Sequence, residues 1–247
     1  MVENAVELDN VSKKFRIYHE KRNSVYESIT GYFDKRKYYE ELQVLKNITF
    51  TIKKGETFAI LGKNGSGKTT LLRILSKIYE PDYGSVSVRG SLVPFLGLGT
   101  GFQIDLTARD NVIQYGVLLG FRKREIESKI DEIIKFAELE KFSDTKLKNF
   151  STGMYARLAF ATAVQVDPDI LLIDEVIQVG DLAFQRKSMD TILDFKKKGK
   201  STIFVTHDMT PVREYCDRAL FLNEGAVAAI GEPNQVIEEY IKVSFPK

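Results

Sequence analysis

The sequence holds a single cysteine, no tryptophan and no apolar run long enough to cross a bilayer. Cys216 has no second cysteine to pair with, so an internal disulfide is excluded, and no group of cysteines and histidines has the spacing of a zinc site. The first residues mix acidic and basic side chains and lack the apolar core of a signal peptide. We therefore expect a protein of the reducing cytosol that reaches a membrane only through another chain.

The sequence also lacks an excess of charge of either sign. The chain carries 36 basic and 34 acidic side chains, a net charge of +2, so its composition gives no argument for binding nucleic acid. Apolar residues make up 43% and charged residues 28%, which are ordinary values for a globular protein. The 247 residues have room for one sizeable core with an appended lobe, or for two small domains.

The spacing of apolar residues predicts an α/β fold. Residues 6–15 and 44–52 alternate apolar and polar side chains, as half-buried strands do. Short apolar runs, typical of strands covered on both faces, occur at 57–61, 170–173 and 202–205. Helices are predicted at 70–78, 182–198 and 235–243. The remaining predicted elements are strands at 85–89 and 92–96, a hairpin of 218–222 with 226–230, and two or three helices in a separate lobe between Arg109 and Val166.

The segment Gly62–Thr69 has the full spacing of a phosphate-binding P-loop between a predicted buried strand and a predicted helix. Its glycines let backbone N–H groups converge on phosphate, and the helix N-terminus adds the positive end of its dipole. Lys68 would hold the β- and γ-phosphates, and Thr69 would place its hydroxyl on Mg²⁺. The alternative is a glycine-rich turn with an exposed lysine. The predicted nucleotide-binding residues here are Gly62, Lys63, Asn64, Gly65, Ser66, Gly67, Lys68, Thr69 and Thr70.

Two carboxylates, Asp174 and Glu175, directly follow the apolar run 170–173. Ligands of open parallel sheets bind at the carboxyl ends of the strands, so both side chains are expected at a binding edge. Asp174 is placed to hold Mg²⁺, directly or through water, and Glu175 to accept a proton from the water that attacks the γ-phosphate. Alternatively, the two acids cap the next turn.

The segment Asn149–Met154 resembles the LSGGQ signature of ABC proteins, in a variant form with Ser151, Thr152 and Gly153. The resemblance implies that this segment, at the start of a helix, reaches the γ-phosphate of ATP held by the P-loop of a second cassette. The alternative is an ordinary helix N-cap by Ser151. The position of the segment between the P-loop and Asp174 favours the signature.

His207 and Asp181 match two further positions of the ABC pattern. The resemblance implies that His207, just after the predicted strand 202–205, senses the γ-phosphate and orients the catalytic water; a structural histidine is the alternative. It also implies that Asp181 belongs to the D-loop, whose aspartate bridges the two cassettes. Capping of the helix that begins at Leu182 is the other role of Asp181, and the two roles are compatible.

Two positions fit the ABC pattern less closely. Gln103 lies in the segment that couples ATP to the membrane subunit, but nearer to Thr107 than usual, so sensing of nucleotide and Mg²⁺ competes with a local loop role. Phe15 is the candidate for an aromatic ring stacked under adenine. We select it because Gln43 stands just before the second predicted strand, where this family often has an aromatic residue.

Residues 16–43 exceed what a minimal cassette needs, and we predict a helical insertion. An apolar stripe repeats at helical spacing in Val25, Ile29, Tyr32 and Phe33. Basic residues at 35–37 precede two tyrosines, a combination that suits a membrane-headgroup surface or an anionic partner. The alternative is a solvated helical hairpin packed on its own domain.

These motifs, with segments 96–102 and 175–181, make the chain similar to the ATP-binding subunits of bacterial cell-surface polysaccharide ABC exporters. The likeness spans nearly the whole chain and is strongest to the O-antigen group, with capsule and teichoic acid exporters as near relatives. It implies one P-loop NTPase domain over 1–247, an ABC-type cassette with a RecA-like core, an antiparallel β subdomain and a helical subdomain. The coupling loop and helical subdomain would occupy about 97–166, and the rest of the core and a C-terminal helix 167–247.

The same resemblance implies an ATPase that uses ATP and Mg²⁺ and works as a homodimer with an integral membrane permease. It places the protein peripherally at the cytoplasmic face of the inner membrane, where the complex moves a lipid-linked polysaccharide, and it implies no nucleic acid partner. A soluble ABC ATPase acting on ribosomes or DNA would carry two cassettes in one chain or long coiled-coil insertions. A P-loop kinase or GTPase would lack the signature-like segment and His207.

Overall fold

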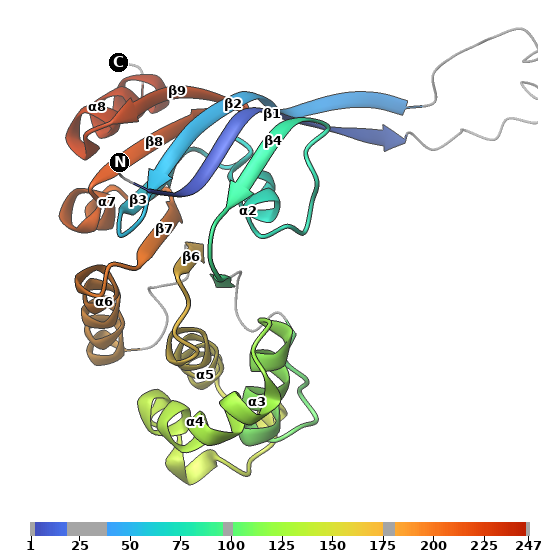
Figure 1. Ribbon diagram of the computed structural model, residues 1–247, viewed down its shortest axis with the longest axis vertical. Coiled ribbons are helices and arrows are strands. Elements are labelled where there is room, and N and C mark those ends of the chain that lie inside the picture. Colours follow the sequence, from blue (N-terminus) through green and yellow to red (C-terminus); the bar gives the residue numbers. More distant parts are fainter. Residues whose placement is uncertain (1–2, 19–38, 96–100, 175–180, 246–247) are drawn as a thin grey trace, which may run out of the picture.

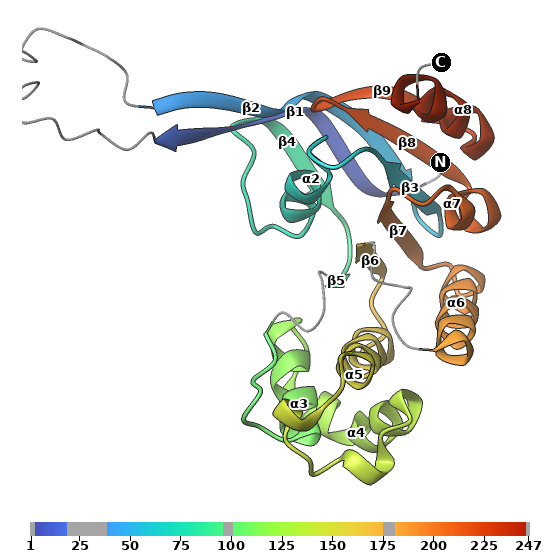
Figure 2. The same ribbon diagram turned by 180° about the vertical axis from the view of Figure 1, so that it is seen from behind.

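The computed structural model describes residues 3–18, 39–95, 101–174 and 181–245 (Figure 1). These residues form two sheets and a lobe of helices. The lobe lies at one end of the molecule, and a two-stranded ribbon projects sideways from the part farthest from it (Figures 1 and 2). The chain therefore has two structurally distinct extensions from one core.

The larger sheet has six strands in the order β5-β6-β7-β3-β8-β9. Neighbouring strands are parallel except in the hairpin of β8 and β9. Its strands are β3 (Thr57–Leu61), β5 (Leu92–Phe95), β6 (Ile170–Asp174), β7 (Ser201–Thr206), β8 (Arg218–Asn223) and β9 (Ala226–Gly231). The three apolar runs of the sequence become β3, β6 and β7, whose side chains are almost all buried because both faces of the sheet are covered.

The smaller sheet is antiparallel, in the order β2-β1-β4. It consists of β1 (Asn4–Tyr18), β2 (Tyr39–Lys53) and β4 (Tyr83–Val88). Phe50 of β2 stacks on Phe58 of β3 with 5.5 Å between the ring centroids, which joins the two sheets. The helix α2 (Lys68–Leu75) packs into the same core through Leu71 and Leu72.

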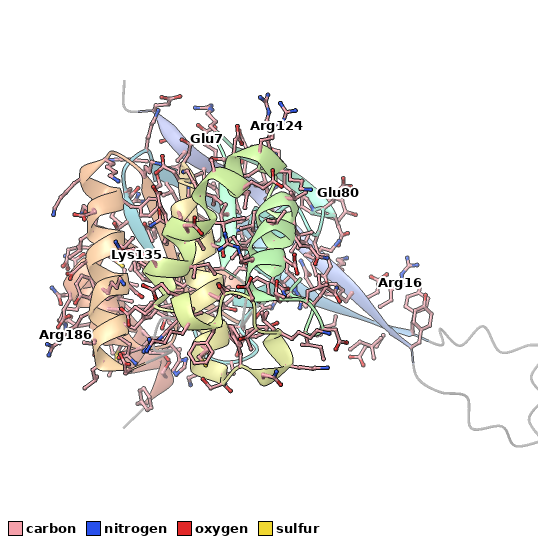
Figure 3. The ribbon with its side chains drawn as sticks, turned by 90° about the horizontal axis from the view of Figure 1, so that it is seen from below. Glu7, Arg16, Glu80, Arg124, Lys135 and Arg186 are labelled. Carbon is pink, nitrogen blue, oxygen red and sulfur yellow. The ribbon has the colours of Figure 1, made fainter. Side chains whose placement is uncertain are left out.

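The lobe contains three α-helices with two short 3₁₀ turns. They are α3 (Ala108–Leu118), α4 (Lys123–Ala137), α5 (Thr152–Gln165) and the turns Glu140–Phe142 and Leu147–Asn149. Phe160 of α5 meets Phe95 of β5 edge-on at 5.8 Å, so the lobe shares a buried cluster with the larger sheet. Three more helices pack against that sheet or its hairpin: α6 (Leu182–Lys197), α7 (Met209–Tyr215) and α8 (Pro233–Ser244). Seen from below, α4, α5 and α6 lie side by side (Figure 3).

The helical insertion predicted over 16–43 is wrong at both of its ends. β1 continues to Tyr18 and β2 already begins at Tyr39, so residues 16–18 and 39–43 are strand. The outer rungs are stabilised by cross-strand pairs, with Arg16 opposite Glu41 and the Tyr18 and Tyr39 rings 5.9 Å apart. Beyond Ser12, β1 no longer pairs with β4, and β1 and β2 alone form the projecting ribbon that carries Arg16 (Figure 3). The predicted apolar stripe from Val25 to Phe33 and the basic residues 35–37 lie outside the described residues.

Two helix predictions also need correction. The helix predicted over 70–78 begins at Lys68 and ends at Leu75, because Lys77 adopts a left-handed φ of 57° and Ile78 N–H donates back to the carbonyl oxygen of Arg73 at 2.8 Å. The short helix α7 was not predicted; Asp208 caps it by accepting a 2.9 Å hydrogen bond from the N–H of Thr210. Among the described helices, none combines the length and apolarity needed to span a membrane.

Candidate functional site

The register of the parallel strands brings three predicted site segments to one edge of the larger sheet. Leu61, the last residue of β3, pairs with Thr206 of β7, and Asp174 at the end of β6 pairs with Val205. Gly62 and His207 directly follow the paired residues Leu61 and Thr206. The P-loop, Asp174 and His207 therefore meet at the carboxyl edge, where open parallel sheets bind their ligands.

The P-loop closes around the side chain of Lys68. This side chain is buried, and its ammonium group donates to the carbonyl oxygens of Gly62 at 2.7 Å and of Lys63 at 3.1 Å. Gly67 is the N-cap residue of α2, with a left-handed φ of 105° and no side chain to cap the helix. The first N–H groups of α2 are thus left for an anion at the positive end of the helix dipole, so the loop fits a phosphate.

Two glycines of the loop are required by space. A Cβ on Gly62 would lie 2.4 Å from the Ser66 hydroxyl oxygen, and a Cβ on Gly67 would lie 3.0 Å from the carbonyl oxygen of Val44. A third glycine, Gly225 in the β8–β9 turn, also supports the loop, although no sequence motif marks it. Its N–H donates to the carbonyl oxygen of Ser66 at 3.0 Å, and its own carbonyl oxygen accepts from Lys46 N–H at 2.7 Å. The turn therefore braces the P-loop against β2.

The predicted magnesium ligands are compatible with a hard cation. Asp174 is partly buried at the end of β6, and Thr69 is exposed in the first turn of α2. Within the described part of the chain, no three His, Cys, Asp or Glu side chains gather as a self-contained metal centre. A hydroxyl and a carboxylate instead match the few protein oxygens that Mg²⁺ uses beside phosphate and water. Glu175, the predicted general base, lies outside the described residues.

The signature-like segment starts α5, as predicted. The Ser151 hydroxyl accepts a 3.2 Å hydrogen bond from the N–H of Met154, so its capping role is confirmed. Ser151 and Thr152 are exposed and Gly153 is half-buried, which leaves this helix N-terminus accessible to another molecule. Its contact with nucleotide on a second cassette stays a prediction.

Asp181 caps α6, as one of its two predicted roles requires. Its carboxylate accepts a 2.9 Å hydrogen bond from the N–H of Phe184 and forms an ion pair with Arg157 of α5. The N–H of Phe184 and the guanidinium of Arg157 hold the pKa of Asp181 below its usual value. His207 is exposed directly after β7, at the same sheet edge as Asp174. The nucleotide-sensing role of His207 stays a prediction.

The backbone of Gln103 has a local structural role. Its N–H donates to the Asn111 side-chain oxygen at 2.7 Å, and its carbonyl oxygen accepts from the Asn111 amide at 2.9 Å. The Gln103 side chain is exposed, and its proposed sensing role is not settled by these contacts.

Phe15 lies within β1, partly buried, with its ring 5.6 Å from that of Tyr79 in an edge-on arrangement. Gln43 does not precede the second strand but lies inside β2, opposite Lys14. The reason for selecting Phe15 was therefore wrong in its geometry. Adenine stacking on Phe15 stays a prediction, and Tyr79 is a neighbouring aromatic ring that the sequence analysis did not consider.

Comparison with known proteins agrees with this geometry. The sequence profile described as ABC transporter matches residues 45–178. The O-antigen export system ATP-binding protein RfbB of Klebsiella pneumoniae is 37% identical over 244 residues, covering 97% of this chain and 98% of the relative. The protein of the same name from Myxococcus xanthus is 44% identical over 199 residues, 81% of this chain but only 46% of the relative, so the chain matches about half of that protein's length.

A teichoic acid exporter subunit and a cassette of known structure are also similar to this chain. The teichoic acids export ATP-binding protein TagH of Bacillus anthracis is 35% identical over 235 residues, 95% of this chain and 42% of the relative. Among solved structures, the dimeric post-hydrolysis state of the ATP-binding cassette MJ0796 bound to ADP and Pi has a TM-score of 0.74 at 25% identity, covering 92% of this chain and 98% of that one.

Proposed function

The chain belongs to the ABC transporter family of ATP-binding proteins, and from this premise we propose that it is the ATP-hydrolysing subunit of an exporter that moves a lipid-linked polysaccharide across the cytoplasmic membrane. The observation that carries the ATPase part is the register that aligns Leu61 with Thr206 and Asp174 with Val205. It places the P-loop, the predicted magnesium ligand and His207 at one edge of the sheet.

Family membership confirms the resemblance to ABC proteins that was inferred from the sequence motifs, and with it the predicted fold. The chain is an ABC ATPase: it binds ATP and belongs to a family that couples ATP hydrolysis to transport. The assignment of individual residues to steps of the reaction goes further and is our proposal.

We assign phosphate binding to Lys68 and to the N–H groups at the start of α2. Thr69 and Asp174, with Gln103 as the sensing side chain, would hold Mg²⁺, which supplies charge neutralisation for the phosphates. Glu175 takes the proton of the attacking water, and His207 orients that water from the end of β7. Phe15 packs against adenine. Preorganised positive groups in a partly buried loop stabilise the charge that develops during transfer.

The site is proposed to be completed by a second copy of the chain. Ser151 and Thr152 are exposed at the N-terminus of α5, where an anion on another molecule would meet their hydroxyls and the positive end of the helix dipole. Asp181 would lie near the same boundary. The similar cassette MJ0796, whose solved structure is a dimer bound to ADP and Pi, supports a homodimer for this chain as well.

The transported molecule and the membrane partner are inferred from the relatives. RfbB of Klebsiella pneumoniae is named for O-antigen export and is matched over 98% of its length, whereas TagH of Bacillus anthracis is matched over 42%. This full-length match favours an O-antigen-like polysaccharide over teichoic acid. The chain would act at the cytoplasmic face of the inner membrane through a separate permease, without nucleic acid. The projecting ribbon, with Arg16 stacked over Tyr39 at 4.8 Å, offers an extension toward that partner.

Glu175→Gln tests the two-copy mechanism. We expect the variant to bind ATP, to lose turnover and to accumulate as an ATP-dependent dimer, measured by light scattering on a sizing column with and without Mg-ATP. Glu140→Gln, an exposed substitution on the lobe, is the matched control and should behave like the unchanged chain. A Glu175→Gln protein that stays monomeric at saturating Mg-ATP would refute the shared site. Co-purification of a permease, and the glycolipid that stimulates its ATPase activity, would test the exporter assignment.

A further inference from the structure

A four-residue charge cluster joins the C-terminal end of α4, the middle of α5 and the first part of α6. We call Glu138, Arg157, Asp181 and Lys187 the Arg157 network. One guanidinium nitrogen of Arg157 lies 3.1 Å from the Glu138 carboxylate, and the other bonds the Asp181 carboxylate. Lys187 donates to the second Glu138 oxygen at 3.0 Å and to the carbonyl oxygen of Phe136 at 2.8 Å. Arg157 and Lys187 thus tie the end of α4 to α5 and α6.

The Arg157 network crosses between two parts of the molecule. α4 and α5 belong to the lobe, whereas α6 packs against β7 of the larger sheet. Figure 3 labels Lys135 on α4 and Arg186 on α6, and α5 contacts both of these helices. α5 begins at the cap Ser151, and α6 begins at the cap Asp181, which follows Asp174 along the chain. Arg157 therefore connects α5, which begins with the signature-like segment, to α6, which packs against β7 of the larger sheet.

The environment of Arg157 gives these contacts a defined geometry. Its side chain is only 17% exposed, and its guanidinium lies 5.1 Å from the centre of the Phe184 ring. Phe184 is buried and meets Phe160 of α5 edge-on at 6.1 Å. A planar guanidinium can stack on this ring and reach two carboxylates at once, whereas a lysine ammonium acts as a single point charge. The site therefore needs arginine in particular.

We propose that Arg157 is a positioning residue for ATP hydrolysis. By holding Asp181 and Glu138 together, it fixes the start of α6 relative to α5, the helix that begins at Ser151. The lobe and the nucleotide edge then take up one relative position. This inference rests on the proposed function, in which Asp174 and Ser151 act on nucleotide in two copies.

A purely structural role for Arg157 makes a different prediction. If the network only added stability, its loss would lower the temperature of unfolding and leave the turnover of the folded molecules unchanged. A positioning role changes kcat in molecules that remain folded and still bind ATP with nearly the same KM. Comparing the change in kcat with the change in unfolding temperature therefore separates the two roles.

The test compares Arg157→Gln, Arg157→Lys and Arg109→Gln in the full chain. Arg109 is the matched control because it pairs with Asp131 at 2.9 Å entirely within the lobe, between α3 and α4. We expect Arg157→Gln to lower kcat about tenfold with KM changed by less than about threefold, and Arg109→Gln to change neither. Arg157→Lys should recover only part of the loss, because it reaches one carboxylate.

The Glu138→Gln variant adds a second readout. Alone it should lower kcat less than Arg157→Gln, and the double variant should be no slower than Arg157→Gln, since both changes break one network. The inference is overturned if Arg157→Gln keeps the kcat of the unchanged chain, or if its loss of kcat disappears at temperatures well below its unfolding temperature. Either result leaves the proposed function standing, because the unchanged chain still hydrolyses ATP. A wild-type chain that neither binds nor hydrolyses ATP would overturn the proposed function itself, and the inference with it.

Discussion

The ammonium group of Lys68 donates a 2.7 Å hydrogen bond to the carbonyl oxygen of Gly62, so the first and last parts of the P-loop are joined through one side chain. Lys68 is only 7% exposed. A buried ammonium is costly unless it is hydrogen-bonded, and the loop carbonyls supply acceptors. The same group therefore shapes the loop and supplies the positive charge that we assign to phosphate binding.

Replacing Lys68 by methionine should abolish nucleotide binding as well as turnover. The change removes the charge and leaves the Gly62 and Lys63 carbonyl oxygens without this donor. We expect kcat/KM for ATP to fall at least about a hundredfold. The rise in unfolding temperature on adding Mg-ATP, measured by calorimetry, should disappear. Lys135→Met, an exposed change on α4, is the control, and an equal loss in both variants would contradict the assignment.

Gly225→Ala should destabilise the chain much more than Gly199→Ala. Both glycines have left-handed φ values, 78° and 72°. A Cβ on Gly225 would lie 2.2 Å from the carbonyl oxygen of Val44, whereas a Cβ on Gly199 meets nothing within 4 Å. We expect about 1 kcal/mol of backbone strain in both and at least about 2 kcal/mol more in Gly225→Ala. Urea unfolding measures the difference, and equal losses would show that the turn moves freely.

Tyr115 should make the stability of the chain fall at alkaline pH. Burial, with a smaller effect of nearby Tyr155, raises the pKa of Tyr115 to about 12 from an ordinary value of about 10. The unfolded chain then loses its phenol proton first. Stability supplied by the neutral form is complete below pH 10 and falls by roughly 1.4 kcal/mol per unit between pH 10 and 12.

Tyr115→Phe should remove this part of the alkaline decline, measured as the change in urea midpoint between pH 9 and 11. Tyr83→Phe is the matched control, because Tyr83 is 64% exposed. A Tyr115→Phe variant that declines as steeply as the unchanged chain would show that another group causes the loss.

Deleting Ser24–Tyr39 should spare the ATPase activity of the isolated subunit more than it spares export. The reason is that the proposed role of this segment lies with the membrane partner, away from the P-loop. We expect ATPase activity to stay within about twofold and export to fall at least about tenfold. A control of full length replaces Val25, Ile29, Tyr32 and Phe33 by serine and should reproduce the export loss. Equal losses in both assays would indicate a structural role.

Local motifs made much of the candidate site predictable. The P-loop, Asp174 and His207 each follow a short apolar strand, and parallel strands end at one edge, so neighbouring segments in sequence were enough to place them together. The caps at Ser151 and Asp181 are likewise decided within one helical turn. Both caps depend on contacts between residues that are close along the chain.

Contacts between distant residues were not predictable in this way. Gly225 was read as an ordinary hairpin turn, because nothing near it in sequence indicates that its N–H reaches Ser66. Residues 39–43 are a tyrosine, two glutamates, a leucine and a glutamine, without apolar alternation, and only their pairing with 14–18 makes them a strand. Arg157 meets Glu138 and Asp181 on two other helices. In each case the partner is supplied by the tertiary fold.

The strands of the projecting ribbon are connected to the P-loop through the Gly225 turn. β1 spans 15 residues, roughly 50 Å of strand, and its register with β2 shifts between Leu8 and Lys14. The N–H of Lys46 in β2 donates to the carbonyl oxygen of Gly225, and the N–H of Gly225 donates to the carbonyl oxygen of Ser66. Two hydrogen bonds therefore connect β2 to the P-loop. A displacement of β2 at Lys46 would therefore reach the phosphate loop through two hydrogen bonds and a single glycine.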